Sequence, residues 1–171
     1  VATVTATLSA VSGQAVTVNL AFSGTATLTS DYTRSGTSIT IPAGSTTGNI
    51  TLTAVQDSID EPNETIIVDI NTVTNGTESG TQQVTATITD DDAAPTVTLS
   101  LSGSPMAEAA GVATVTATLS AVSGQDVTVN LGFSGTATIN TDYTASASSI
   151  TITAGGTTGS ITLTAIQDAI D

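Results

Sequence analysis

The sequence predicts an all-β protein: an antiparallel β-sandwich that is repeated in tandem. Two observations carry this prediction. Apolar and polar residues alternate with a period of two through most of the chain, as in strands with one face in a core and one in water. In addition, residues 1–60 return as residues 112–171 with 47 of 60 paired positions identical. Because the offset of 111 residues is the size of a small domain, we expect one domain per repeat.

Each expected strand is marked by an alternating run between turn residues. In the first run, Val4, Ala6 and Leu8 alternate with threonines, which favour the pleated surface of a sheet. Pairs such as Ser12-Gly13 and Ser23-Gly24 punctuate the runs and predict turns. The later runs of the first copy have their apolar residues at Val16, Val18 and Leu20; Ile39 and Ile41; Ile50, Leu52 and Ala54; Ile66, Val68 and Ile70; and Val84, Ala86 and Ile88. Many short alternating strands of this kind predict a sandwich.

The domain boundaries are expected at 1–92 and 96–171, with Ala93-Ala94-Pro95 (93–95) as the linker. Pro95 cannot donate to a ladder and restrains the residue before it. The second copy opens with the strand VTLSLS at 97–102, which has no counterpart before Val1. The first copy therefore lacks its opening strand and the second lacks its last two strands. We expect an exposed edge and an open core in each, filled by residues outside these 171 or by a neighbouring chain.

The composition excludes several functions. Fifteen acidic residues against a single basic one, Arg34, give a formal net charge of −14. This balance argues against nucleic acid and anionic membranes and favours bound cations. The chain has no cysteine, so disulfides do not stabilise it. No apolar run reaches the roughly 18 residues that a membrane span needs, so direct membrane insertion is not expected.

The acidic residues gather in loops that an antiparallel sandwich can bring to one pole. Converging carboxylates repel one another and must take up protons or bind a cation. Since the chain has no histidine or cysteine, hard oxygen ligands favour Ca²⁺, with Mg²⁺ a weaker candidate. Solvated loop acids are the alternative interpretation. The DxxDExxE spacing from Asp57 to Glu64, followed by the aspartate run 90–92, favours the cation.

Several segments together resemble the Calx-beta domain, which occurs in sodium–calcium exchangers and in long bacterial surface and adhesin proteins. They are GTATLTSDYT with GTATINTDYT, SITIPAGSTTGNITLTAVQDSIDEPNET with SITITAGGTTGSITLTAIQDAID, and VTATITDDD. The resemblance covers the whole chain. It implies a seven-stranded immunoglobulin-like sandwich with calcium at one pole.

The resemblance also implies a set of calcium ligands. Gln56 and Gln167 stand where the strongest calcium binders of the family have a second carboxylate, which implies a weaker site or fewer ions. The implied ligands are Asp31 and Asp142 before the tyrosines; Asp57, Glu61 and Glu64 with the carbonyl of Ile59 in the acidic loop; Asp90, Asp91 and Asp92 in the terminal run; Glu108 after the opening strand; and Asp168, which repeats Asp57.

We do not expect an enzyme, because nucleophilic catalysis needs a base near serine or threonine and the chain has no histidine, cysteine or lysine. The expected function is a calcium-binding, calcium-stiffened spacer or stalk in a long extracellular adhesin or filament on a bacterial surface. Its partners are then neighbouring repeats. One open alternative is a module that pairs through its exposed sheet edges with like chains or another partner. The other is a calcium sensor domain.

Overall fold

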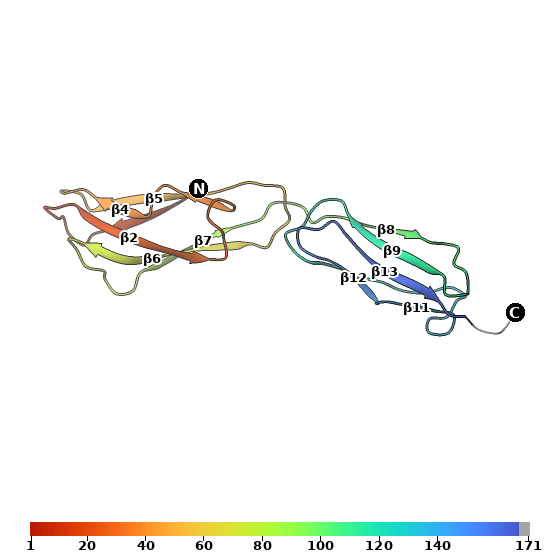
Figure 1. Ribbon diagram of the computed structural model, residues 1–171. Coiled ribbons are helices and arrows are strands. Elements are labelled where there is room, and N and C mark those ends of the chain that lie inside the picture. The colour runs from red at the N-terminus through yellow and green to blue at the C-terminus, as the bar shows by residue number, and fades with distance from the viewer. Residues whose placement is uncertain (168–171) are drawn as a thin grey trace. The chain divides into compact units, whose positions relative to one another are not determined.

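The computed structural model describes residues 1–167 and contains only strands, turns and irregular segments over that range. The chain divides into two compact units. Unit 1 consists of Val1–Asp57 and Asn63–Asp90, and unit 2 consists of Ser58–Pro62 and Asp91–Asp171. Within each unit the strands form two layers (Figure 1). This arrangement confirms the predicted all-β sandwich.

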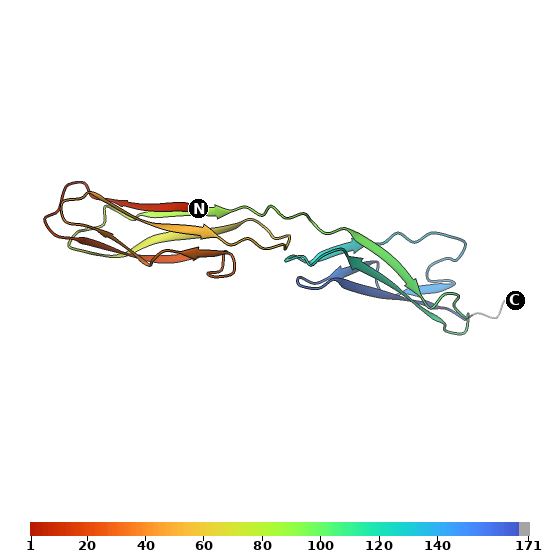
Figure 2. The ribbon, with the colours of Figure 1, turned by 90° about the horizontal axis from the view of Figure 1, so that it is seen from above.

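Unit 1 contains a three-stranded sheet and a four-stranded sheet, both antiparallel. The first has the order β1-β5-β3 and the second the order β4-β2-β6-β7. The free edges β1 and β7 lie on the same side of this unit, one in each layer (Figure 2). The strands are β1 (Ala2–Thr7), β2 (Val16–Gly24), β3 (Tyr32–Arg34), β4 (Ser38–Ile41), β5 (Thr47–Ala54), β6 (Glu64–Thr74) and β7 (Gln83–Ile88).

The core of unit 1 lies between these two sheets and uses the alternating apolar residues of the sequence. Ile39 and Ile41 of β4 are fully buried, because side chains of alternate residues on a strand point to the same face. Two neighbouring groups of buried side chains make up this core. They are Val16, Val18, Ile39, Ile41 and Ile50, and Tyr32, Leu52, Ile66 and Val68.

The turn predicted at Ser23-Gly24 is wrong, because β2 continues through both residues. β6 pairs with β2 as far as Gly24, which lies opposite Ile66. Gly24 has φ of 119°, and a Cβ atom there would lie 2.1 Å from the carbonyl oxygen of Thr65. The glycine at this position therefore serves the close approach of two strands.

Unit 2 contains a four-stranded sheet with the order β11-β13-β9-β8 and a two-stranded sheet of β10 and β12. Its segment Ser58–Pro62 is held through Asp60, whose carboxylate accepts a hydrogen bond from Ser123 Oγ at 3.1 Å. The strands are β8 (Val97–Ser102), β9 (Val112–Leu119), β10 (Val127–Asn130), β11 (Tyr143–Ala145), β12 (Ser149–Ile152) and β13 (Thr158–Ala165).

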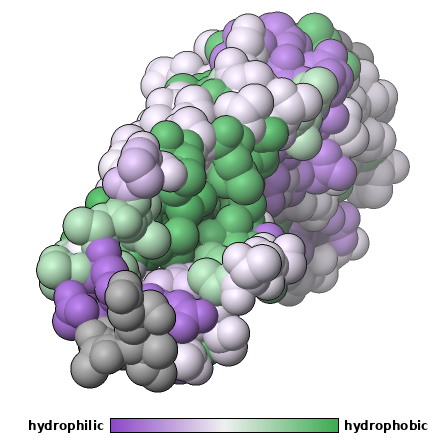
Figure 3. All heavy atoms as spheres, turned by 90° about the vertical axis from the view of Figure 1, so that its right-hand side faces the viewer, coloured by the Kyte–Doolittle hydropathy of each residue, from purple (hydrophilic) through white to green (hydrophobic). Residues whose placement is uncertain are grey.

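The core of unit 2 repeats that of unit 1 but is covered by fewer strands. Its buried residues are Ala117, Leu119, Ile150, Ile152 and Ile161. Apolar side chains also reach the surface, and they gather in one broad area of the face shown in Figure 3. The exposed apolar residues of this unit include Leu99 and Leu101 of β8. Two of the strands that unit 1 uses in its second layer, β6 and β7, have no counterpart among the described residues of unit 2.

Candidate metal centre

Asp31 lies in the turn that precedes β3, and the turn itself depends on its carboxylate. Asp31 Oδ2 accepts a hydrogen bond from the Thr27 N–H at 2.5 Å, and the Asp31 N–H donates to the Thr27 carbonyl at 3.0 Å. Asp142 repeats both bonds with Thr138, at 2.6 and 2.8 Å. A carboxylate has a second oxygen that this turn does not use. The two aspartates are therefore held in a fixed orientation with one oxygen left for a ligand.

The same turn is fastened to the end of the neighbouring strand. The Asp31 carbonyl accepts a hydrogen bond from the Val55 N–H at 2.9 Å, directly after β5. The Asp142 carbonyl accepts one from the Ile166 N–H at 2.9 Å, directly after β13. The turn with its aspartate therefore lies where the connection from β5 to β6 begins.

Three carboxylates of the first repeat come together at this place. One carboxylate oxygen from each of Asp31, Glu61 and Glu64 lies within 4.8 Å of the other two, and all three residues are half-buried. Asp31 precedes β3, Glu61 lies in the connection between β5 and β6, and Glu64 is the first residue of β6. At an effective dielectric constant of about 20, two unit charges at this separation repel by about 3 kcal/mol before water screens them. The arrangement therefore favours a shared cation.

The geometry fits calcium. Calcium–oxygen distances are about 2.3 to 2.6 Å, so two ligands on opposite sides of one ion lie about 5 Å apart. The separation of up to 4.8 Å among the three carboxylates is within a single coordination sphere. The only basic side chain, Arg34, places its guanidinium 4.1 Å from the centre of the Phe22 ring. Three hard anionic oxygens without a histidine or thiol are ligands that calcium prefers.

The remaining predicted ligands of the first repeat lie in the connection between β5 and β6 and after β7, outside this group of three. The Asp90 N–H donates to Asn63 Oδ1 at 3.0 Å, which places the start of the aspartate run beside the residue before Glu64. Asp57 and Asp91 are exposed, whereas Ile59, Asp90 and Asp92 are half-buried. Over residues 1–167, the group of Asp31, Glu61 and Glu64 is the one that gathers three carboxylates this closely.

In unit 2 the structure brings two predicted ligand loops to the end of one strand. Glu108 is exposed in the turn between β8 and β9, and this turn ends at Gly111, whose carbonyl accepts a hydrogen bond from the Ala165 N–H at 2.9 Å. Asp142 is bonded to the next residue, Ile166. Both loops therefore meet at the end of β13. The predicted ligand Asp168 lies outside the described residues.

Sequence reasoning missed the structural role of the two aspartates. Asp31 and Asp142 were predicted as metal ligands only, yet each also closes a turn through the N–H four residues earlier. The signal was present in the sequence, since both copies keep threonine four residues before aspartate within GTAT…DYT. Short polar side chains with this spacing often bond to nearby backbone groups.

Among residues 1–167, no helix is long and apolar enough to cross a membrane.

The model of the Calx-beta domain matches the chain twice, at residues 1–92 and 90–171. Among solved structures, "Crystal structure of CBD12 from CALX1.2" is similar with a TM-score of 0.47 and 15% sequence identity, covering 98% of this chain and 69% of that chain. No curated protein matched. Calx-beta domains are calcium-binding regulatory domains. The chain belongs to the Calx-beta domain family, whose model it matches in two consecutive copies.

Proposed function

We propose that the first repeat binds a calcium ion through Asp31, Glu61 and Glu64, and that the ion stabilises a structural repeat of an extracellular stalk. The observation that carries this proposal is the approach of three half-buried carboxylates to within 4.8 Å of one another. Such a group is costly without a cation because each charge repels two others. A bound ion removes this cost and adds its own binding free energy to folding.

The ligands come from elements that belong to different layers of the sandwich. Asp31 precedes β3 in the sheet β1-β5-β3, and Glu64 begins β6 in the sheet β4-β2-β6-β7. Glu61 belongs to the connection between β5 and β6, which crosses from one sheet to the other. An ion held by all three joins the two layers at this end. The proposed role is therefore mechanical: calcium resists the separation of the sheets.

The extracellular setting is supported by the kind of calcium site that the three carboxylates would make. Three carboxylates at partly exposed positions are suited to the weak affinities of extracellular calcium modules, about 10⁻⁴ to 10⁻³ M. The near-identity of the two copies and the net charge of −14 also favour a repetitive, soluble spacer over a catalyst. We accordingly place the protein at the cell surface, without catalytic activity, with neighbouring repeats as its partners.

Thermal unfolding of the 171-residue chain in calcium, in magnesium and in chelator tests the proposal. An ion present at about 10 to 100 times its Kd stabilises the folded state by about 1.4 to 2.7 kcal/mol. For a domain of under 100 residues this corresponds to a rise in Tm of roughly 6 to 20 °C. Magnesium should give a smaller rise, because it prefers fewer carboxylates and more water. Equal Tm values in calcium and chelator would refute the site.

A further inference from the structure

Unit 2 includes a short segment that is far away in sequence from its strands. Residues 58–62 belong to the connection between β5 and β6, yet they are grouped with Asp91–Asp171 rather than with the residues on either side of them. The chain leaves unit 1 after Asp57 and returns to it at Asn63. The contacts of this segment show what holds it in unit 2.

One turn of unit 2, at residues 123–125 between β9 and β10, binds the segment. The Gly124 N–H donates a hydrogen bond to the Asp60 carbonyl at 2.9 Å. Ser123 Oγ donates to Asp60 Oδ2 at 3.1 Å, and the two residues also form an isolated parallel β-bridge. The turn therefore binds both the main chain and the side chain of a single aspartate.

The hydroxyl of Ser123 is buried and needs such a partner. Ser123 is 1% exposed, and a buried hydroxyl without a hydrogen bond lowers stability. Its oxygen already accepts a hydrogen bond from the Gln125 N–H at 3.1 Å. Its proton is directed to the Asp60 carboxylate, and hydrogen bonds to a charged group are stronger than those between neutral groups. The hydroxyl thus favours an acidic residue at this position.

The bonds that shape the turn itself are local and occur in both copies. The sequence VSGQ is present at 11–14 and at 122–125. In each copy the serine Oγ accepts a hydrogen bond from the N–H of the glutamine two residues later at 3.1 Å, and the serine carbonyl accepts one from a glycine N–H at 2.9 Å. The bonds from Ser123 and its neighbour to Asp60 are additional to this set. They are not part of forming the turn.

The absence of a side chain at Gly124 lets the segment come close to the turn. A Cβ atom there would lie 2.7 Å from Cγ of Glu61, closer than two carbon atoms pack without displacement. The turn therefore offers a buried hydroxyl, a main-chain N–H and an open surface beside them. These features suit an extended segment that carries an aspartate.

We propose that the turn 123–125 is a recognition site for the connection between β5 and β6 of the preceding repeat, and that Asp60 is the residue it selects. The partner is an acidic connecting segment of a like domain, bound through one carboxylate and one carbonyl. Asp60 is outside the acidic group of Asp31, Glu61 and Glu64, so the contact does not require a cation. Within the DxxDExxE spacing, Asp60 therefore has a role different from that of the metal ligands.

Both halves of the contact belong to the repeated sequence. The turn VSGQ occurs in each copy, and the sequence QDSID at 56–60 returns as QDAID at 167–171, of which 168–171 lie outside the described residues. Because the turn and the segment are different surfaces, the contact is heterologous and has a direction. Each repeat presents its segment to the repeat that follows it, and the pair of aspartate and serine sets the order of neighbours.

A disulfide tests the contact in the full chain, which has no cysteine of its own. A chain carrying both Asp60→Cys and Ser123→Cys is oxidised mildly in chelator, so that bound calcium does not contribute. Partners in a β-bridge lie about 5 Å apart, within the Cα separation of about 4.4 to 6.8 Å that a disulfide spans. The matched control carries Asp60→Cys and Ser12→Cys, with the second cysteine in the same turn of the first copy.

We expect the first pair to close within the chain at least about tenfold faster than the control pair, because residues that are held together have a high effective concentration. Equal rates of closure would overturn the proposal.

Hydrogen exchange of two matched amides tests whether the hydrogen bonds persist in solution. Gly124 and Gly13 both lie between a serine and a glutamine, so their unprotected exchange rates are the same. In chelator the Gly124 N–H, which donates to the Asp60 carbonyl, should exchange about tenfold or more slowly than the Gly13 N–H. Equal exchange, or protection of Gly124 that appears only after calcium is added, would overturn the proposal.

Variants then test whether the two side chains act as a pair. Ser123→Ala and Asp60→Ala should each speed the exchange of Gly124 by about tenfold, and the double variant should add little, because either change removes the same bond. Asp60→Asn should keep most of the protection, since its amide oxygen accepts the same hydrogen bond. The control Ser12→Ala should leave Gly124 unchanged. Additive effects of the two alanines, or an effect of Ser123→Ala no larger than that of the control, would contradict the assignment.

Discussion

Replacing one carboxylate of the acidic group should change stability in opposite directions with and without calcium. In Glu61→Gln the side chain keeps its size and one oxygen but loses its charge. In chelator the substitution removes repulsion from Asp31 and Glu64, whose oxygens lie within 4.8 Å. In calcium the same substitution removes an anionic ligand. The sign of the effect therefore reports whether the three carboxylates act as one cation site.

The magnitudes follow from these separations. Each of the two removed pairs is worth about 3 kcal/mol at a dielectric constant of about 20, and water around half-buried groups reduces the total strongly. We expect a net gain of about 1 kcal/mol in chelator, or roughly 4 to 8 °C in Tm for a unit of this size. If losing the charge weakens calcium binding about tenfold, the calcium-induced stabilisation falls from about 2.7 to about 1.4 kcal/mol.

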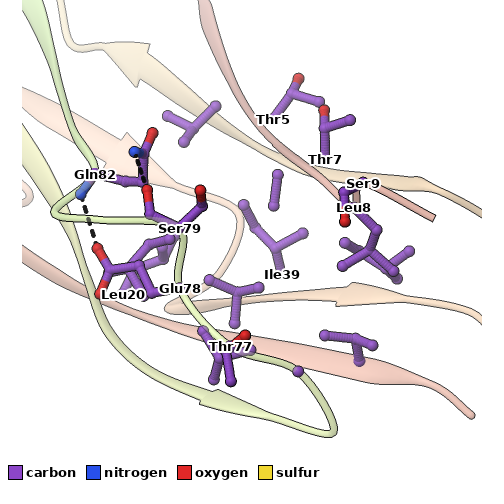
Figure 4. A pocket seen from close by; sticks show the side chains of 18 of the residues that line it. Thr5, Thr7, Leu8, Ser9, Leu20, Ile39, Thr77, Glu78, Ser79 and Gln82 are labelled. Atoms are coloured by element: carbon purple, nitrogen blue, oxygen red, sulfur yellow. Dashed lines mark hydrogen bonds between the residues drawn. The ribbon is translucent and has the colours of Figure 1, made fainter. Parts of the chain in front are cut away.

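Differential scanning calorimetry of the chain and the variant, each in calcium and in chelator, measures both effects. The control is Glu78→Gln, at a glutamate of the same repeat outside the acidic group. Glu78 Oε1 accepts a hydrogen bond from the Gln82 N–H at 2.7 Å, which a glutamine oxygen can replace (Figure 4). Its effect should be the same with and without calcium. If Glu61→Gln behaved like this control, the carboxylates would be independent solvated groups and the reasoning would be refuted.

Three further predictions concern the fold of unit 1. Ile41→Ala should lower the free energy of unfolding by about 2 to 5 kcal/mol, because the side chain is fully buried; urea titration showing under 1 kcal/mol would contradict this. Gly48→Ala should lower the free energy of unfolding by about 1 to 3 kcal/mol in the same assay, because the added Cβ would lie 2.7 Å from the Thr40 carbonyl oxygen. An unchanged free energy would mean that the strands separate easily. Thr29→Gly should stabilise the fold by about 1 kcal/mol and so raise Tm, because the β-branched Thr29 holds a φ of 78°. A lower Tm would show that the threonine side chain stabilises the turn.

The alternation of apolar residues predicted which segments are strands but not how long they are. Residues 16–20 and 127–131 have the same sequence, VTVNL, in different surroundings. In unit 1 this segment begins a strand of nine residues, β2, whereas in unit 2 the strand β10 ends after four. Over residues 1–167, β2 pairs with both β6 and β4, whereas the pairing of β10 is with β12. Strand length here is set by partners far away in sequence, which local patterns do not contain.

The candidate metal centre was predictable to the extent that it depends on strand ends. Asp31, Glu61 and Glu64 come together because the turn before β3 and the start of β6 meet where β5 ends, an arrangement that follows from the sandwich. The sequence could not rank the other acids of the same loops. Asp57 is four residues from Glu61 and has the same chemistry, yet it is exposed and outside the group of three. Loop conformation decides between them, and the periodicity of strands carries no information about it.

The repeated sequence gives two views of the turn that carries the first ligand. The turn around Asp31 recurs around Asp142 with the same hydrogen bonds to the threonine four residues earlier. The sequence of each copy therefore fixes the orientation of this aspartate locally, whereas the approach of Glu61 and Glu64 depends on how β5 and β6 are connected. Calcium should therefore act where the turn before β3 and the connection from β5 meet the start of β6.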